Sequence, residues 1–137
     1  MTCSGSAPAA SWQRVIPLLA PHVRVAAYDR AGLGGSDPAP GLATIDRMTG
    51  DLASVITGLG TRPCVLAGHS LGGILVQLLA FRQPGLVAGL VLVDPGHEEQ
   101  GRHAVVGGTG HNIPRDRPDV VAGTILAVAA QVRAGGG

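Results

Sequence analysis

The residues best suited to chemistry in this chain surround a serine between two glycines, in Gly68-His69-Ser70-Leu71-Gly72. An apolar run at 63–67 precedes this Gly-x-Ser-x-Gly pattern, and a segment of helical period at 71–82 follows it. A strand that turns sharply into a helix strains the serine backbone and exposes its hydroxyl, while flanking glycines avoid Cβ clashes in the tight turn. The pattern therefore predicts Ser70 as a nucleophile, and the alternative is an ordinary glycine-rich turn.

A nucleophilic Ser70 needs two further groups. A hydroxyl is a poor nucleophile near neutral pH, so an imidazole must lie within hydrogen-bond reach to accept its proton. The chain has five histidines, and any single histidine is more often a surface residue than a catalytic base. A developing oxyanion also needs hydrogen-bond donors, and the amide of Leu71, at the start of a helix, can be one of them.

A second glycine-rich segment, Asp29-Arg30-Ala31-Gly32-Leu33-Gly34-Gly35-Ser36, follows a run rich in β-branched residues at 22–28. Such a loop could cradle a phosphate group. It lacks the Gly-Lys-Ser/Thr ending of a P-loop, however, which argues against nucleotide binding. We expect Asp29 to be a structural turn residue and not a catalytic acid.

These two motifs resemble the α/β-hydrolase superfamily, and the resemblance covers nearly the whole chain. It implies a reduced α/β fold, with a mostly parallel sheet flanked by helices, and the activity of a serine esterase. In that family a Gly-His pair on the loop after the eighth strand supplies the general base. The matching pair here is Gly110-His111, which follows a short strand-like run and precedes the last helix. The resemblance therefore points to His111.

The resemblance leaves the third member of the triad open. In most of the family this acid follows the seventh strand, for which the sequence has no match, and in members similar to haloalkane dehalogenases it follows the sixth. Asp94 ends the run equated with the sixth strand, and Glu98 and Glu99 are the substitutes. Acidic residues also end strands merely to accept loop hydrogen bonds, which is the alternative for Asp94. The second oxyanion amide would come from Gly5 or Ser6.

Short apolar runs alternate with segments of helical period along the chain, which is typical of an α/β protein. Strands are expected at 22–28, 63–67, 86–93 and 103–106. The run 86–93 is apolar on both faces, which predicts a central strand. Helices are expected at 12–20, capped by Ser11 and bent or ended near Pro17, at 45–60, capped by Thr44, at 71–82, and from 116 to about 133. Residues 1–137 would form a single domain with a frayed tail from residue 134.

The composition excludes several other classes of protein. The formal net charge is +1, with ten arginines, no lysine and three aromatic residues, which leaves neither a basic footprint nor stacking platforms for nucleic acid. Cys3 and Cys64 cannot make a disulfide scaffold, and no Cys-x-x-Cys or His-x-x-x-His spacing indicates a metal site. The apolar stretch 120–132 is too short to span a bilayer, and the N-terminus has no signal-peptide pattern. We expect a soluble cytoplasmic protein without a metal or a diffusible cofactor.

The resemblance also implies missing parts, because the family's domain is longer. This chain would begin just after the third strand, and residues 96–103 leave no room for a lid or a seventh strand. The sheet would then have two gaps, each one strand wide, and unpaired strands leave backbone polar groups unsatisfied. The neighbouring strands could close up, which would shift His111 by about 5 Å relative to Ser70 for each lost strand. Alternatively, a second copy of the chain could fill the gaps in a homodimer.

The leading hypothesis is a serine hydrolase that cleaves a carboxylic ester, or a similar small acyl substrate, through an acyl-enzyme. Ser70, His111 and Asp94 would form the triad, and a site without a lid predicts low selectivity. Two alternatives remain open. One is a catalytically silent relative that acts as a binding or interaction module, and the other is an acyltransferase that passes the acyl group to an alcohol or a thiol.

Overall fold

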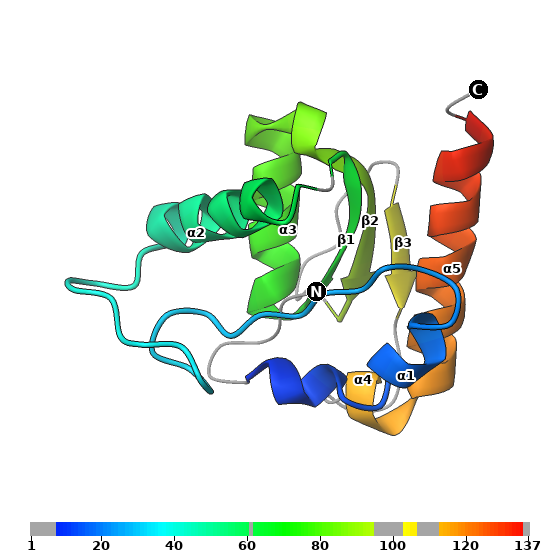
Figure 1. Cartoon of the computed structure of the whole chain (residues 1–137), viewed down its shortest axis with the longest axis horizontal. Coiled ribbons are helices and arrows are strands. Elements are labelled where there is room, and N and C mark those ends of the chain that lie inside the picture. The colour runs from blue at the N-terminus through cyan, green and yellow to red at the C-terminus, as the bar shows by residue number, and fades with distance from the viewer. Residues whose placement is uncertain (1–7, 61, 95–102, 107–112, 136–137) are drawn as a thin grey trace.

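The computed structural model of the chain describes residues 8–60, 62–94, 103–106 and 113–135 (Figure 1). Three parallel strands form a sheet in these residues, in the order β1 (Cys64–His69), β2 (Val87–Val93) and β3 (His103–Val106). Helices cover both faces of the sheet, so the fold is α/β, as predicted. No helix among the described residues is long and apolar enough to cross a membrane.

The helices form one layer on each side of the sheet (Figure 1). The first layer consists of α2 (Ile45–Gly58) and α3 (Leu71–Arg82). The second layer contains α5 (Pro118–Gly135), which packs along β2, together with three short elements at the end of the molecule to which the arrowheads of β2 and β3 point. These short elements are the 3-10 helix η1 (Ala9–Trp12), α1 (Ile16–Leu19) and α4 (Ile113–Asp116). A further 3-10 turn, η2 (Pro84–Leu86), leads into β2.

The alternating side chains of β2 divide the core into two parts. Val91 and Val93 join the cluster beneath α5, whereas Leu92 joins the cluster beneath α2 and α3. All three side chains are fully buried. Because successive residues of a strand point to opposite faces, a run that is apolar at every position needs cover on both sides. The prediction of a central strand here is confirmed by the sheet order.

Most of the other predicted elements are also present. The Oγ1 atom of Thr44 accepts a hydrogen bond of 3.2 Å from the Arg47 amide, so Thr44 is the predicted N-cap of α2. The bounds of α3 are those expected, and β1 begins and ends within two residues of its predicted run. The last helix is divided into α4 and α5, and α5 extends to Gly135, so residues 134–135 are helical.

The predicted helix at 12–20 is wrong. Two short pieces, η1 and α1, take its place, and Pro17 lies in the first turn of α1. Proline has no N–H and its ring clashes with the carbonyl four residues earlier, so a helix can begin at Pro17 but cannot pass through it. Ser11 is not the cap, because its hydroxyl lies within η1 and donates to the carbonyl of Pro8 at 2.8 Å.

The predicted strand at 22–28 is also wrong, because residues 24–30 have no strand assignment and are not part of the sheet. β-branched residues favour an extended backbone, but a strand also needs a neighbouring strand with which to form hydrogen bonds. The two predicted gaps therefore have different outcomes. β2 pairs directly with β3, which closes the gap expected there, whereas within the described residues β2 is the only strand that pairs with β1.

Asp29 ties the end of this extended segment to the glycine-rich loop that follows. Its carboxylate accepts a hydrogen bond of 2.6 Å from the Ala9 amide and one of 3.0 Å from the Gly35 amide. Gly34 has a φ of +53°, and a Cβ at that position would collide with the Asp29 carboxylate. The hydrogen bond from Ala9, with a smaller contribution from Gly35, lowers the pKa of Asp29 below its ordinary value of 3.8. The structural role predicted for Asp29 is consistent with these contacts.

Replacing Asp29 by asparagine removes the charge that these amides stabilise, so we expect Asp29→Asn to lower the free energy of unfolding at neutral pH. The folded pKa of Asp29 is depressed, so its contribution is present above the ordinary aspartate pKa and is lost as the pH falls through the folded value. Urea unfolding of both proteins from neutral to acid pH measures the difference in stability. The difference should shrink towards acid pH, and a constant difference would contradict the role given to the carboxylate.

Candidate active site

Ser70 lies at the sharp turn between β1 and α3, with a φ of 50° and a ψ of −121°. A residue with a side chain rarely adopts this conformation, which costs on the order of 1–3 kcal/mol. The backbone hydrogen bonds around Ser70 hold it there. Its amide donates to the carbonyl of Val93 at 3.1 Å, and its carbonyl accepts from the amides of Gly73 at 2.8 Å and Ile74 at 3.4 Å.

Gly68 makes this turn sterically possible. A Cβ at Gly68 would collide with the carbonyl group of Gly72 and would come within 2.7 Å of the Gly73 nitrogen. The first turn of α3 therefore lies directly against the backbone of β1. Both helix glycines are buried, as is His69, whose side chain is 3% exposed. Gly68 thus has the packing role expected of it, and Ser70 is the half-buried residue between the two glycines of the motif.

The start of α3 also directs amides towards the serine. The first four N–H groups of a helix have no partner within the helix. In α3 the amides of Gly73 and Ile74 bond to the Ser70 carbonyl, which leaves those of Leu71 and Gly72 at the open end of the helix. The positive end of the helix dipole reinforces them. An oxyanion formed at Ser70 would therefore meet donors from Leu71 and its neighbour.

Asp94 follows β2 and is half-buried beside this turn. β1 and β2 are adjacent and parallel, with His69 opposite Val93, so the residues after each strand emerge side by side. The hydrogen bond from the Ser70 amide to the Val93 carbonyl joins the two strand ends. Asp94 has a φ of 44°, and within the described part of the chain it is the only residue besides Ser70 and the glycines with a positive φ.

The strain at Asp94 is a feature that sequence reasoning missed. Aspartate adopts the left-handed conformation more readily than most residues, so its position before Pro95 at a strand end was the only available signal. Strained residues cluster at functional sites, and two adjacent strand ends each carry one here. The structure therefore brings Ser70, Leu71 and Asp94 together at the carboxyl edge of the sheet. The predicted residues His111, Gly5, Ser6, Glu98 and Glu99 lie outside the described residues.

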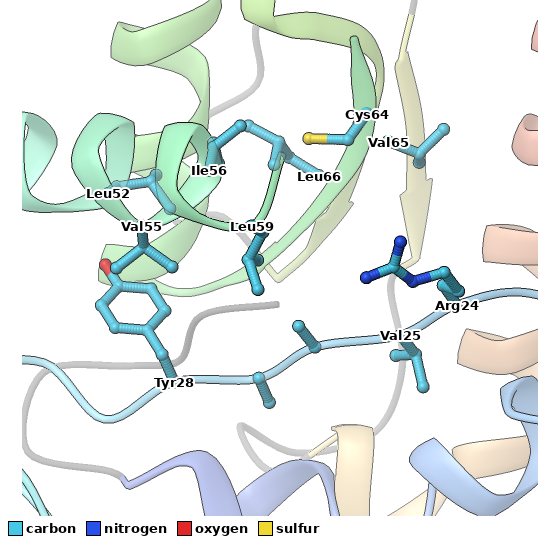
Figure 2. Close-up of a pocket in the computed structure, with 12 residues that line it drawn as sticks. Arg24, Val25, Tyr28, Leu52, Val55, Ile56, Leu59, Cys64, Val65 and Leu66 are labelled. Carbon is cyan, nitrogen blue, oxygen red and sulfur yellow. The ribbon is translucent and has the colours of Figure 1, made fainter. Parts of the chain in front are cut away.

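A cavity of about 200 Å³ lies elsewhere, between the extended segment 24–28, α2 and the first half of β1 (Figure 2). Its closest lining residue on β1 is Leu66, four residues before Ser70. At about 3.3 Å per residue along a strand, the two are separated by roughly 13 Å. This cavity is therefore not part of the candidate active site.

Comparison with known proteins settles the family. A family model described as the alpha/beta hydrolase family matches residues 3–135, almost the whole chain. The chain belongs to the alpha/beta hydrolase family. In this member of the alpha/beta hydrolase family, Ser70 lies at the turn between β1 and α3.

Individual relatives match between about half and two thirds of this alpha/beta hydrolase. RutD of Pantoea ananatis, which is named as a carbamate hydrolase, is 37% identical over 84 residues, or 61% of this chain and 30% of the relative. Lipase LipV of Mycobacterium tuberculosis is 40% identical over 84 residues, or 61% of this chain and 31% of the lipase. The structure of a thermophilic esterase from Thermogutta terrifontis aligns with a TM-score of 0.64 and 33% identity, over 68% of this chain and 35% of the esterase.

The chain thus spans about a third of the length of each of these relatives. The relatives' names also include an epoxide hydrolase of Xenopus tropicalis. The relatives are therefore named for hydrolases that act on different bonds.

The packing at Gly68 predicts a large effect of a single methyl group. We expect Gly68→Ala to be destabilised by about 1–3 kcal/mol, because the helix backbone that its Cβ would meet must shift. Gly123 in α5 is the matched control, because it is exposed and a Cβ there has no atom within 4 Å. Gly123→Ala should be stabilised by roughly 0.5–1 kcal/mol through the higher helix propensity of alanine. Urea unfolding measures both, and a Gly68→Ala variant as stable as the parent would contradict the close approach.

Proposed function

We propose that this chain is a serine hydrolase that cleaves a carboxylic ester, or a similar small acyl substrate, through an acyl-enzyme intermediate. The observation that carries the proposal is the strained turn at Ser70, which projects the residue between β1 and α3 beside the strand end that carries Asp94. The names of lipase and esterase relatives support an ester as the substrate.

In the first half of the proposed reaction, the Oγ atom of Ser70 attacks the carbonyl carbon of the ester. His111 accepts the serine proton, and Asp94 orients and stabilises the imidazolium that results. The tetrahedral oxyanion forms near the amide of Leu71, with a second donor from Gly5 or Ser6. Collapse of this intermediate expels the alcohol, which receives the proton from His111, and leaves the acyl group on the serine.

In the second half, water attacks the acyl-enzyme with His111 as the general base, and the carboxylic acid leaves while the Ser70 hydroxyl is regenerated. The chemistry needs only a nucleophile, a base, an acid that orients it and backbone donors, so the proposal involves no metal and no diffusible cofactor. The expected partner is a small ester, and the proposed selectivity for it is low.

A fluorophosphonate probe tests the nucleophile, because it forms a covalent bond with an activated serine. We expect the protein to be labelled, and Ser70→Ala to abolish the labelling. Ser54→Ala is the matched control, because Ser54 is an exposed serine on α2 that bonds only to the carbonyl of Gly50 among described groups. Its labelling should equal that of the parent. A folded, monodisperse protein that does not react overturns the hydrolase and favours the silent interaction module.

The base and the acid are tested by the rate of the same reaction and by hydrolysis of a p-nitrophenyl acetate substrate. His111→Ala should lower both rates about 10²–10⁴-fold, which is the usual contribution of a general base. Asp94→Asn should lower them as well and shift the pH profile of hydrolysis, since the imidazolium loses its partner. Unchanged rates in Asp94→Asn, with lower rates in Glu98→Gln or Glu99→Gln, would contradict the assignment of the acid.

A competition experiment separates hydrolysis from acyl transfer. The protein is given the same ester with and without an added alcohol, and the acid and the new ester are both measured. A hydrolase should produce mainly the acid. Predominant transfer to the alcohol would instead identify an acyltransferase that uses the same serine.

A further inference from the structure

α4 is a helix of only four residues that begins two residues after His111, the proposed general base. It lies at the end of the molecule to which the arrowheads of β2 and β3 point, which is also the carboxyl edge that carries Ser70 (Figure 1). A helix this short is not stable on its own, so its position depends on its contacts with the rest of the protein. These contacts therefore determine where the chain lies immediately after the proposed base.

The start of α4 is held by the hydrophobic core. Ile113, its first residue, is 3% exposed and belongs to the same cluster as Trp12, whose side chain is fully buried. η1, which ends at Trp12, packs against α4. Apolar contacts of this kind are not directional. Burial of Ile113 therefore holds α4 in place at its first residue but does not fix the direction of the helix.

The end of α4 is held by Arg14, which lies between η1 and α1. Pro118 has no N–H and separates the hydrogen bonds of α4 from those of α5. Among the described residues, the only donor to the carbonyl of Arg115 is the side chain of Arg14, whose Nη1 atom donates to it at 3.2 Å. Arginine side chains commonly satisfy carbonyls at helix ends in this way. This bond gives α4 a second point of attachment, through a residue 101 positions away in the sequence.

We propose that Arg14 is a positioning residue for His111. By holding the end of α4, its guanidinium fixes the direction in which the chain enters this helix from residue 111. The serine proton can be transferred only to a base within hydrogen-bond reach, and a displacement of about 1 Å can lower a rate as much as 10²-fold. The inference rests on the proposed hydrolase and adds to it a residue that contacts neither the substrate nor the reacting atoms.

The hydrogen bond from Arg14 is exposed, which makes the proposal testable without unfolding the protein. Arg14 and Arg115 are both exposed, and neither forms an ion pair with a described residue. An exposed hydrogen bond contributes little to the stability of a whole chain. Removal of the guanidinium should therefore change the alignment of the base while the core around Trp12 stays intact.

The first test is the rate of the proposed reaction in Arg14→Ala. We expect the rate of fluorophosphonate labelling, and kcat for hydrolysis of p-nitrophenyl acetate, to fall about three- to tenfold, as for a displacement of a fraction of an ångström. KM should change little, because Arg14 does not contact the substrate. Arg14→Lys keeps a donor and should recover part of the rate. Arg115→Ala removes an equal charge at the same place but keeps the backbone carbonyl, so it should not reproduce the loss.

A double-mutant cycle tests whether Arg14 acts through His111. In a His111→Ala background the base is absent, so Arg14→Ala should cause no further loss. Imidazole added to His111→Ala supplies a base that is not attached to the chain, and the labelling rate that it restores should be the same with and without Arg14→Ala. A loss of stability would instead lower all of these rates by the same factor. Additive losses, or a lower restored rate, would overturn the positioning role.

Failure of this inference differs from failure of the proposed hydrolase. If the protein is labelled at Ser70 and His111→Ala slows the labelling, while Arg14→Ala leaves it unchanged, the hydrolase stands and the role given to Arg14 is wrong. If the folded parent is not labelled, or His111→Ala has no effect, the proposed function fails and the inference fails with it. Circular dichroism of each variant establishes that the comparison is made between folded proteins.

Discussion

The close approach of α3 to β1 at Gly68 is the constraint on which the rest of the structure depends. Because no side chain separates them, the helix begins immediately after the strand, and Ser70 must take up the whole change of direction. The resulting strain is offset by hydrogen bonds to the Ser70 amide and carbonyl. One of these bonds, to Val93, also fixes the end of β2, from which Asp94 emerges. This one steric requirement therefore places the candidate nucleophile Ser70, the amides at the start of α3 and Asp94 at the same edge of the sheet.

The two gaps expected in the sheet have different outcomes, because the chain segments beside each gap have different hydrogen-bond partners. On one side β2 and β3 pair directly, which satisfies the backbone groups on their facing edges. On the other side, the segment 24–28 ends at Asp29, whose carboxylate is held by amides of Ala9 and Gly35 and not by the sheet. The cavity lies between this segment and the first half of β1.

The sequence predicts well those elements whose signals are local. Thr44 caps α2 because its hydroxyl meets an amide three residues later, and the alternation of apolar residues in β2 identifies the centre of the sheet. The elements predicted wrongly depend on more distant neighbours. The run at 22–28 has the composition of a strand but is not part of the sheet, and the run at 12–20 forms two short helical pieces where the pattern predicts one helix bent or ended near Pro17. At the candidate site, the serine motif predicts the turn, whereas the positive φ of Asp94 arises from the packed strand ends and leaves no comparable pattern.

β1 borders both the candidate active site and the cavity. Its carboxyl end leads into Ser70, and residues 64–66 line the cavity. The turn at Ser70 is held by hydrogen bonds to Val93 and to the first turn of α3, and none of these residues lines the cavity. The geometry of the strained turn is therefore determined by the sheet and by α3, independently of what occupies the cavity.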